Sequence, residues 1–420
     1  SALDTEIKDM LVKFDWNINE SHRASLRLNK TEQTLPILPN FGSRSLSLSS
    51  HWYNNIREFE SSVAQLYSDW TPAFSTEVSF TTSKQASDND IGTPLPAIQI
   101  CLNSTNCSGA DSLWIGTERF RHVNVVKVDT QAFFAAGTYS WGDHATKFGV
   151  DYDSKDIFNL FGRDQFGAQD LFDFGWGNWT STLRWNRAVN SKLFFNATAV
   201  YSDYTYSLGT PEDAVPSFKL DSRIQNTVTN VGWTYYASNR HKLDWGVQNT
   251  YYVFSPGKIT GAFDIALSKE YANESALYFS DDIKVTERLS ATTGLRYSGF
   301  ANLGPRTVYT YADPRYPTTT SIVDTTVFAR GDVVKTFIGL AGFEPRLALN
   351  YEVGPKASLK LSYNRSRQYI HLISNNTTAT PVNVWRPAGT YIDPATVDQV
   401  AVGVVQNFRE DNGIRLTLEG

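Results

Sequence analysis

Neighbouring carboxylates are the first residues of this sequence that could do chemistry. Asp281 and Asp282 are adjacent, and Asp151 and Asp153 are two apart on the face that also carries Lys147. Paired carboxylates can act as general acid and base. Adjacent residues of a strand point to opposite faces, however, so Asp281 and Asp282 are not expected to cooperate. The other pair is explained best as a row of solvated charges, with an ion site as the alternative.

No further catalytic pattern is visible. The 6 His residues are scattered without a pair at metal-ligand spacing, no Ser lies in a nucleophile elbow, and no glycine-rich phosphate loop follows a strand. We therefore expect no enzyme, no metal site and no cofactor. The formal net charge of -5 and the lack of a basic stripe argue against nucleic acid as a partner.

The chain has 2 cysteines, Cys101 and Cys107, in a polar stretch rich in Gly, Ser and Asn. A disulfide within a loop, formed in an oxidising compartment, is the predicted state. Free thiols are the alternative, and a metal site would need more ligands than His122, which is the nearest candidate.

Aromatic and amide side chains gather in one predicted connection and form the best candidate for recognition. These speculative ligand-binding residues are Tyr369, His371, Asn375, Trp385 and Tyr391. Aromatic faces and amides could hold a sugar or an aromatic metal chelator, and loops often carry binding while a rigid scaffold positions them. Packing within the loop or at a membrane interface explains Trp385 and Tyr391 equally well.

Strands with a two-residue period must position these side chains. In the segment 277–297, Leu277, Phe279 and Ile283 fall on one face, whereas Tyr278 and Asp282 fall on the other. Such alternation gives each strand one apolar and one polar face. No run approaches the ~18 apolar residues that a membrane-spanning helix needs. The apolar faces must therefore meet either a second sheet or lipid.

The pattern predicts about sixteen strands whose connections alternate between short and long. The long connections are 34–55, 86–117, 159–177, 208–222, 256–269, 301–341 and 368–394. Strict alternation is typical of a transmembrane barrel, and the aromatic content of 14% suits its girdles. We predict an all-β, antiparallel up-and-down transmembrane barrel that forms a single domain over 1–420, with a soluble β-sandwich as the alternative. Charged residues would then line the interior, among them Asp282, Arg296 and Arg346.

Several motifs resemble a known family. Residues 281–284, Leu289 and 294–297 resemble the barrel motif of TonB-dependent receptors. Residues 366–375, 384–387 and 398–403 resemble the Bacteroidetes receptors of that family, whereas 14–19, 22–27 and 63–70 resemble its Oar-like branch. The character of the resemblance changes near 169–190.

This resemblance implies an outer-membrane receptor that takes up a nutrient such as an oligosaccharide, a peptide or a metal chelate. It also implies a plug domain, through which such receptors contact the TonB complex, and we find no plug before Asp15. Asp282, Arg296 and Arg346 would contact that plug. The family's barrels have 22 strands, so this chain would be part of one. Outer-membrane lipid and a small solute are the other implied partners.

Two further functions stay open. A passive porin would fold a constriction loop inward, for which 86–117 or 301–341 are the candidates. A structural or adhesive surface protein would use its loops rather than its lumen. If the chain acts without a plug, we expect a leaky pore that shows no TonB-dependent uptake.

Overall fold

A computed structural model describes residues 4–102, 111–118, 123–162, 169–210, 218–261, 265–313, 315, 317–373, 384–407 and 415–419. These residues form β-strands and short 3-10 turns, and no α-helix occurs among them. None of the described segments is a helix long and apolar enough to cross a membrane.

One antiparallel sheet of 18 strands dominates the fold, and two of its members, β14 and β19, are short additions. The remaining strands follow one another around the sheet in chain order, about sixteen in number as predicted. They are β1 (Glu6–Asn17), β2 (His22–Ile37), β4 (Tyr53–Thr71), β5 (Phe74–Asp90), β8 (Val123–Trp141), β9 (His144–Gly162), β10 (Gln169–Ala188), β11 (Leu193–Gly209), β12 (Phe218–Tyr236), β13 (His241–Gly261), β15 (Glu270–Lys284), β16 (Leu289–Leu303), β20 (Phe343–Gly354), β21 (Ala357–Gln368), β24 (Ala395–Asn407) and β25 (Arg415–Glu419).

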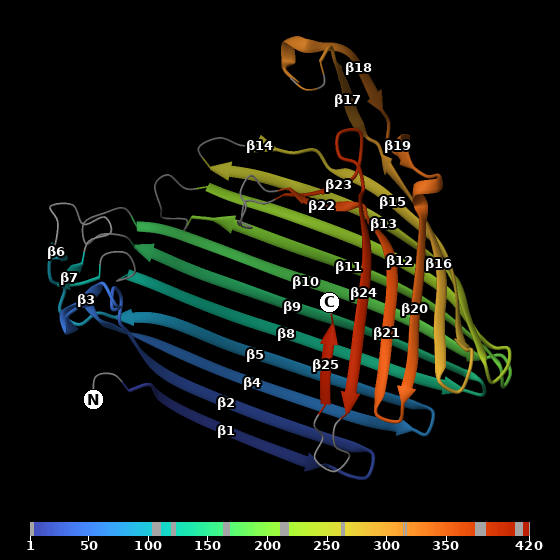
Figure 1. The fold of residues 1–420 in the computed structure, drawn as a ribbon, viewed down its shortest axis with the longest axis horizontal. Coiled ribbons are helices and arrows are strands. Elements are labelled where there is room, and N and C mark those ends of the chain that lie inside the picture. The colour runs from blue at the N-terminus through green and yellow to red at the C-terminus, as the bar shows by residue number, and fades with distance from the viewer. Residues whose placement is uncertain are drawn as a thin grey trace.

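The remaining elements all belong to the long connections. They are β3 (Ser45–Ser47), η1 (Ser49–His51), β6 (Ile98–Cys101), β7 (Ser112–Ile115), β14 (Ile265–Ala266), β17 (Arg306–Tyr311), η2 (Thr319–Ser321), β18 (Ile322–Phe328), β19 (Val333–Phe337), η3 (Leu340–Gly342), β22 (Ile370–Ile373) and β23 (Val384–Pro387). Figure 1 shows these elements at one end of the sheet and the short turns at the other. The predicted alternation of short and long connections is therefore present.

One predicted connection is wrong in extent. Strand β9 runs to Gly162 and β10 begins at Gln169, so the connection predicted over 159–177 is much shorter. Gly175 and Gly177 lie within β10, where β9 and β11 pair with them on both sides. A central position in a sheet satisfies the backbone groups of a glycine even though its own strand propensity is low.

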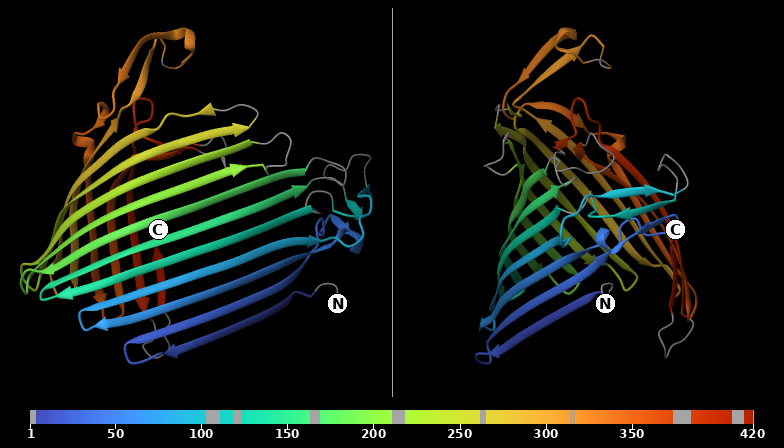
Figure 2. Two further views of the ribbon diagram at one scale, coloured as in Figure 1. Left: turned by 180° about the vertical axis from the view of Figure 1, so that it is seen from behind. Right: turned by 90° about the vertical axis from the view of Figure 1, so that its left-hand side faces the viewer.

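The sheet curves into an open barrel wall. Figure 2 shows β1 and β25 at two separate edges, and no ladder among the described residues joins them. An edge strand leaves a row of unpaired N–H and C=O groups, which a membrane interior cannot satisfy. Each edge of this wall therefore offers backbone groups for a further strand.

The register places the predicted apolar residues on one face. Trp245 pairs with Phe279, which pairs with Leu295 on the next strand. Leu349 pairs with Leu361, which pairs with Val402. Because paired residues point to the same side of a sheet, these side chains form one continuous apolar surface on the outside of the curve. The polar residues between them face the concave side.

Aromatic rings form a belt on the outer face close to the short turns. Successive ring centroids lie 5.1–6.2 Å apart along this belt. Its members are Tyr139, Trp141, His144, Trp185, Phe195, Trp233 and Trp245. Farther up the strands, Tyr152 and Trp179 make a second contact at 6.3 Å. Aromatic side chains at the margins of an apolar band are typical of a barrel that spans a membrane.

Replacing Gly246 with Ala is expected to destabilise the wall by about 1–3 kcal/mol, the usual cost of overpacking. A Cβ at this position would lie 2.4 Å from the Val231 carbonyl oxygen and 2.4 Å from the Tyr278 hydroxyl. Denaturant unfolding in lipid vesicles measures the change. Gly294→Ala is the control, since its Cβ would meet nothing closer than 3.4 Å. Equal stability of the two variants would contradict this packing.

Candidate functional site

The connection 368–394, which carries the candidate recognition residues, folds back onto the concave side of the wall as the β22–β23 hairpin (Figure 1). Tyr369, at its root, is 3% exposed, and its ring stacks on Phe300 of β16 at 4.9 Å with an interplanar angle of 4°. The Tyr369 hydroxyl shares a hydrogen bond of 2.7 Å with Ser298. Ala272 and Ala388 are fully buried in the same cluster. The hairpin is thus packed against the inner wall.

A single carboxylate connects this hairpin to the wall. Glu270, the first residue of β15, has a side chain that is 7% exposed and accepts hydrogen bonds from two guanidiniums. Arg306 of β17 lies 3.0 Å away, and Arg386 of β23 contacts the other carboxylate oxygen. Burial lowers the pKa of Arg306 and of Arg386, but arginine titrates so high that both stay charged. Glu270 therefore binds the β17–β18 hairpin and the β22–β23 hairpin at the same place on the wall.

A second cluster lies beside the first on the inner wall. Arg296 of β16 donates to Gln248 at 2.8 Å and to Glu274 at 3.3 Å, and its Nε lies 3.7 Å from Glu344. Glu344 also accepts a hydrogen bond from Ser298, the residue that contacts Tyr369. Polar groups in a network of this kind hold one another in fixed orientations.

The three residues predicted to line the lumen lie on this concave face. Arg296 belongs to the cluster above. Asp282 accepts from Thr292 at 2.7 Å and pairs with Lys242 at 3.2 Å, near the short turns. Arg346 lies two residues from Glu344 in β20, so the strand period puts both on one face. Their contact with a plug stays a prediction.

The predicted ligand-binding residues have different surroundings. Trp385 is 37% exposed and lies opposite Leu372 in the hairpin. His371 lies opposite Arg386, and one of its ring nitrogens is buried. Tyr391 is exposed, but its hydroxyl bonds to the backbone nitrogen and oxygen of Tyr309 at 3.1 and 2.9 Å. Asn375 lies outside the described residues.

Sequence reasoning missed the wall side of this site. Glu270, Asn302 and Arg306 were not among the candidates, although Arg306 donates to both of the others. The available signal was weak: Glu270, like Glu274, belongs to the polar face of a strand whose other inward residues, Ala272 and Ala276, are small and buried. A carboxylate among small buried residues needs a charged partner, which the sequence did not identify.

The described hairpins of the two connections named as constriction-loop candidates do not lie on the inner wall. The β17–β18 hairpin, from the connection 301–341, projects away from the wall (Figure 1). Strand β7, from 86–117, pairs with β6 and with β3 at the far end of the long strands. The element on the inner wall comes instead from 368–394, because buried contacts to β15 and β16 hold it there.

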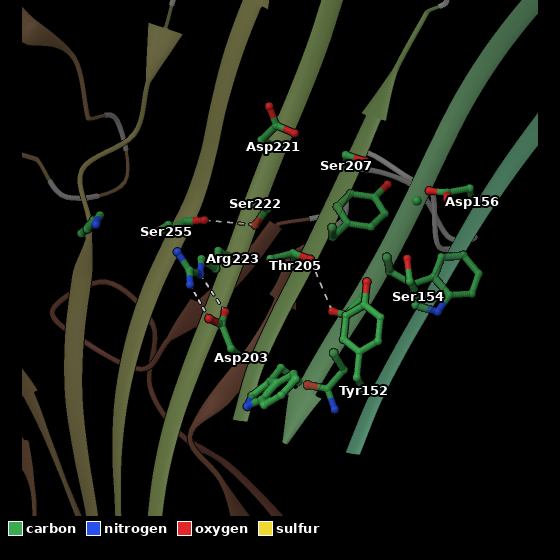
Figure 3. Close-up of a pocket in the computed structure, with 17 residues that line it drawn as sticks. Tyr152, Ser154, Asp156, Asp203, Thr205, Ser207, Asp221, Ser222, Arg223 and Ser255 are labelled. Carbon is green, nitrogen blue, oxygen red and sulfur yellow. Dashed lines mark hydrogen bonds and ion pairs between the residues drawn. The ribbon is translucent and has the colours of Figure 1, made fainter. Parts of the chain in front are cut away.

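A polar depression of about 540 Å³ lies over β9–β12 (Figure 3). Asp203 and Arg223 form a hydrogen bond of 2.7 Å in it. Strand periodicity puts Asp203 on the same face as Phe195, and Arg223 on the same face as Trp233, so both lie on the outer side of the wall. This depression therefore does not lie on the inner surface that carries the β22–β23 hairpin.

Cys101 ends β6 and is disulfide-bonded, whereas Cys107 lies outside the described residues. We expect mass spectrometry of a non-reduced digest to find a peptide that links Cys101 to Cys107. Detection of two alkylated free cysteines would contradict the predicted pairing. Among the described residues, no group of three or more His, Cys, Asp or Glu could hold a metal ion.

Comparison with known proteins supports the architecture. Residues 159–419 match the family model of the TonB dependent receptor-like β-barrel. A solved structure, the ferric yersiniabactin uptake receptor FyuA from Yersinia pestis, is 12% identical with a TM-score of 0.59 over 97% of this chain and 58% of that receptor. The alcaligin outer membrane receptor FauA from Bordetella pertussis is 11% identical with a TM-score of 0.49, over 99% of this chain and 66% of that one. No curated protein matches the sequence.

The chain spans 58% of the length of the yersiniabactin receptor, whose similarity supports the fold alone. The finer resemblance to the Oar-like and Bacteroidetes branches stays a prediction. The family model, however, covers more than half of the chain. Its match ends at residue 419, the last residue of β25. The chain therefore belongs to the TonB-dependent receptor family, whose β-barrels lie in the Gram-negative outer membrane and serve transport rather than catalysis.

Proposed function

We propose that this chain forms the barrel of a receptor for energy-coupled uptake of a nutrient across the outer membrane. The family and the two-faced wall support this proposal, since one face is apolar and the other carries connected polar clusters. A solute would enter between the long connections and meet the β22–β23 hairpin on the inner wall. The match of residues 159–419 to the TonB-dependent receptor barrel family is the observation that carries the proposal. The hairpin lies inward because its root, Tyr369, is buried against β16.

The solute classes are those that the sequence suggested, namely an oligosaccharide, a peptide or a metal chelate. Trp385 offers a partly exposed aromatic face on the hairpin, which suits stacking with a sugar ring or a planar chelator. Asp282, Arg296 and Arg346 would contact a plug within the lumen. Through that plug the receptor would receive energy from the TonB complex.

Uptake by whole cells tests the proposal. Cells with and without the complete receptor would be compared on labelled oligosaccharides, peptides and ferric chelates, before and after a protonophore collapses the proton gradient. We expect saturable uptake of one class that depends on the receptor and stops with the gradient. Receptor-dependent uptake that does not saturate and survives the protonophore would contradict coupling and favour a passive porin.

The inward hairpin itself is what keeps a porin as the second candidate, because a passive channel also needs an element that narrows its lumen. Conductance in planar bilayers separates the two. If the complete protein is a porin, it should conduct ions steadily. If it is a plugged receptor, it should not conduct.

A further inference from the structure

The polar depression over β9–β12 lies on the outside of the wall, away from the inner surface that a transported solute would meet (Figure 3). Its floor includes Gly175 and Gly177, whose missing side chains leave the backbone of β10 uncovered. Gly177 pairs with Ser154 on one side and with Thr205 on the other, so all three residues share the outer face. The strands themselves therefore shape this depression.

The depression lies about one membrane thickness from the aromatic belt near the short turns. On β12, Arg223 of the depression precedes Trp233 of the belt by ten residues, and on β11 Thr205 follows Phe195 by ten residues. A tilted strand crosses the hydrocarbon core in about 9–11 residues. The depression is therefore at the level of the lipid headgroups on the side of the long connections, which is the outer leaflet.

Two aromatic rings line the side of the depression that is nearer the apolar band. Tyr152 and Trp179 are both partly exposed, and their ring centroids are 6.3 Å apart. Beyond them toward the short turns, Val150 and Leu183 continue the same face. A ligand in the depression could thus stack a sugar ring on an aromatic face and extend an apolar chain over the band.

The lining is rich in hydroxyl groups and has nearly balanced charge. Asp203 accepts a hydrogen bond of 2.7 Å from Arg223, whose side chain is half-exposed. Asp156, Asp221 and Lys269 bring the total to three carboxylates and two cations. Hydroxyls both donate and accept, and they come from Ser154, Thr205, Ser207, Ser222 and Ser255. Such a lining suits a neutral ligand with many hydroxyl groups better than a phosphate, which the carboxylates would repel.

From these observations we infer that this depression binds the saccharide headgroup of a glycolipid in the outer leaflet, with the acyl chains against the apolar band. A second depression of about 410 Å³ shares Asp156, Gly175 and Ser207 with the first and continues toward the long connections, which extends the surface available to the headgroup. The inference goes beyond the proposed function, because the site faces lipid rather than the lumen and does not depend on transport.

Native mass spectrometry of the complete receptor, purified in lauryldimethylamine oxide, tests this site with three probes. They are a diacylglycerol that carries a maltose headgroup, phosphatidylglycerol with the same acyl chains, and free maltose. We expect the maltose lipid to bind about ten-fold more tightly than phosphatidylglycerol, the effect of a few neutral hydrogen bonds. Free maltose should bind more weakly than the maltose lipid because it has no chains to place on the apolar band.

Two variants locate the binding. Gly177→Val fills the floor and should weaken binding of the maltose lipid by about ten-fold or more. A Cβ there would lie 3.3 Å from the Asp153 carbonyl oxygen and 3.5 Å from Thr205 Oγ1, so the strand can accept it with a small adjustment. Thr205→Val keeps the shape but removes a hydroxyl, and it should weaken binding by about three-fold if Gly177→Val does not fold. Gly294→Val is the matched control, since it makes the same change on the concave face, where its Cβ would meet nothing closer than 3.4 Å.

Three results would overturn the inference. Tighter binding of phosphatidylglycerol than of the maltose lipid would show a site for anionic headgroups. Equal binding of free maltose and the maltose lipid would show a site for soluble sugar. Unchanged binding of the maltose lipid by both Gly177→Val and Thr205→Val would place its site elsewhere. Failure of cells to take up any nutrient would instead contradict the proposed function and leave a measured glycolipid site in place.

Discussion

Arginine in place of Leu361 is expected to destabilise the membrane-inserted barrel by about 2–4 kcal/mol, the cost of a charge on the lipid face near the bilayer midplane. Leu361 is 43% exposed and pairs with Leu349 on one side and Val402 on the other. No polar partner is available on that surface, so the guanidinium would have to reach for the interface or draw water into the lipid. Either response costs free energy that the unfolded chain in water does not pay.

The neighbouring residue supplies the control. Ser362 points to the concave face, where Arg should change the free energy of unfolding by only about 0.5 kcal/mol, as for an ordinary surface substitution. Urea titration of both variants in lipid vesicles, followed by tryptophan fluorescence, gives the two free energies. If Leu361→Arg and Ser362→Arg cost the same, the assignment of the two faces is wrong.

Replacing Glu270 with Gln should release both hairpins that it holds. Arg306 and Arg386 would lose the charge that compensates them, and breaking a buried pair by removing one partner costs about 3–5 kcal/mol. We expect about 3 kcal/mol, because both guanidiniums keep some contact with water. The loss should be local, since the hydrogen-bonded ladders of the wall do not include these side chains.

Hydrogen exchange measures this release directly. Amides of β22, β23 and β17 should exchange faster in Glu270→Gln, whereas those in the middle of β15 and β16 should keep their protection. Asp398→Asn serves as the control, because the Arg365–Asp398 pair at 2.7 Å is exposed to solvent and is expected to contribute little to stability. Unchanged protection of the hairpin amides in Glu270→Gln would show that Glu270 does not hold them.

The barrel wall could be predicted from sequence because its signal is local. Alternation such as that of Leu359, Lys360 and Leu361 fixes both the strand and the face of each side chain, without knowledge of the partner strand. The same pattern also separates short turns from long connections. The exception is 159–177, where Gly175 and Gly177 have low strand propensity but are paired on both sides within β10.

The site could not be predicted in the same way because it depends on contacts between distant segments. Glu270 and Arg386 are 116 positions apart, and nothing in either local sequence indicates the other. Whether a long connection folds inward or projects outward also has no periodic signal. Tyr369 and Trp385 were candidates because their aromatic rings could bind a ligand. Their burial and their partners, however, depend on how the hairpin packs on β16.

The arrangement of lipid face, concave face and inward hairpin is tested most directly by fluorophores on single cysteines, in receptor whose own cysteines are replaced by serine. Residues 359–362 of β21 and Leu372 of the hairpin would be labelled in turn, in vesicles that contain either brominated lipid or aqueous iodide. We predict that brominated lipid quenches labels at Leu359 and Leu361, while iodide quenches those at Lys360, Ser362 and Leu372. Quenching by lipid at Ser362 or Leu372, or its absence at Leu361, would contradict a barrel wall with the hairpin inside.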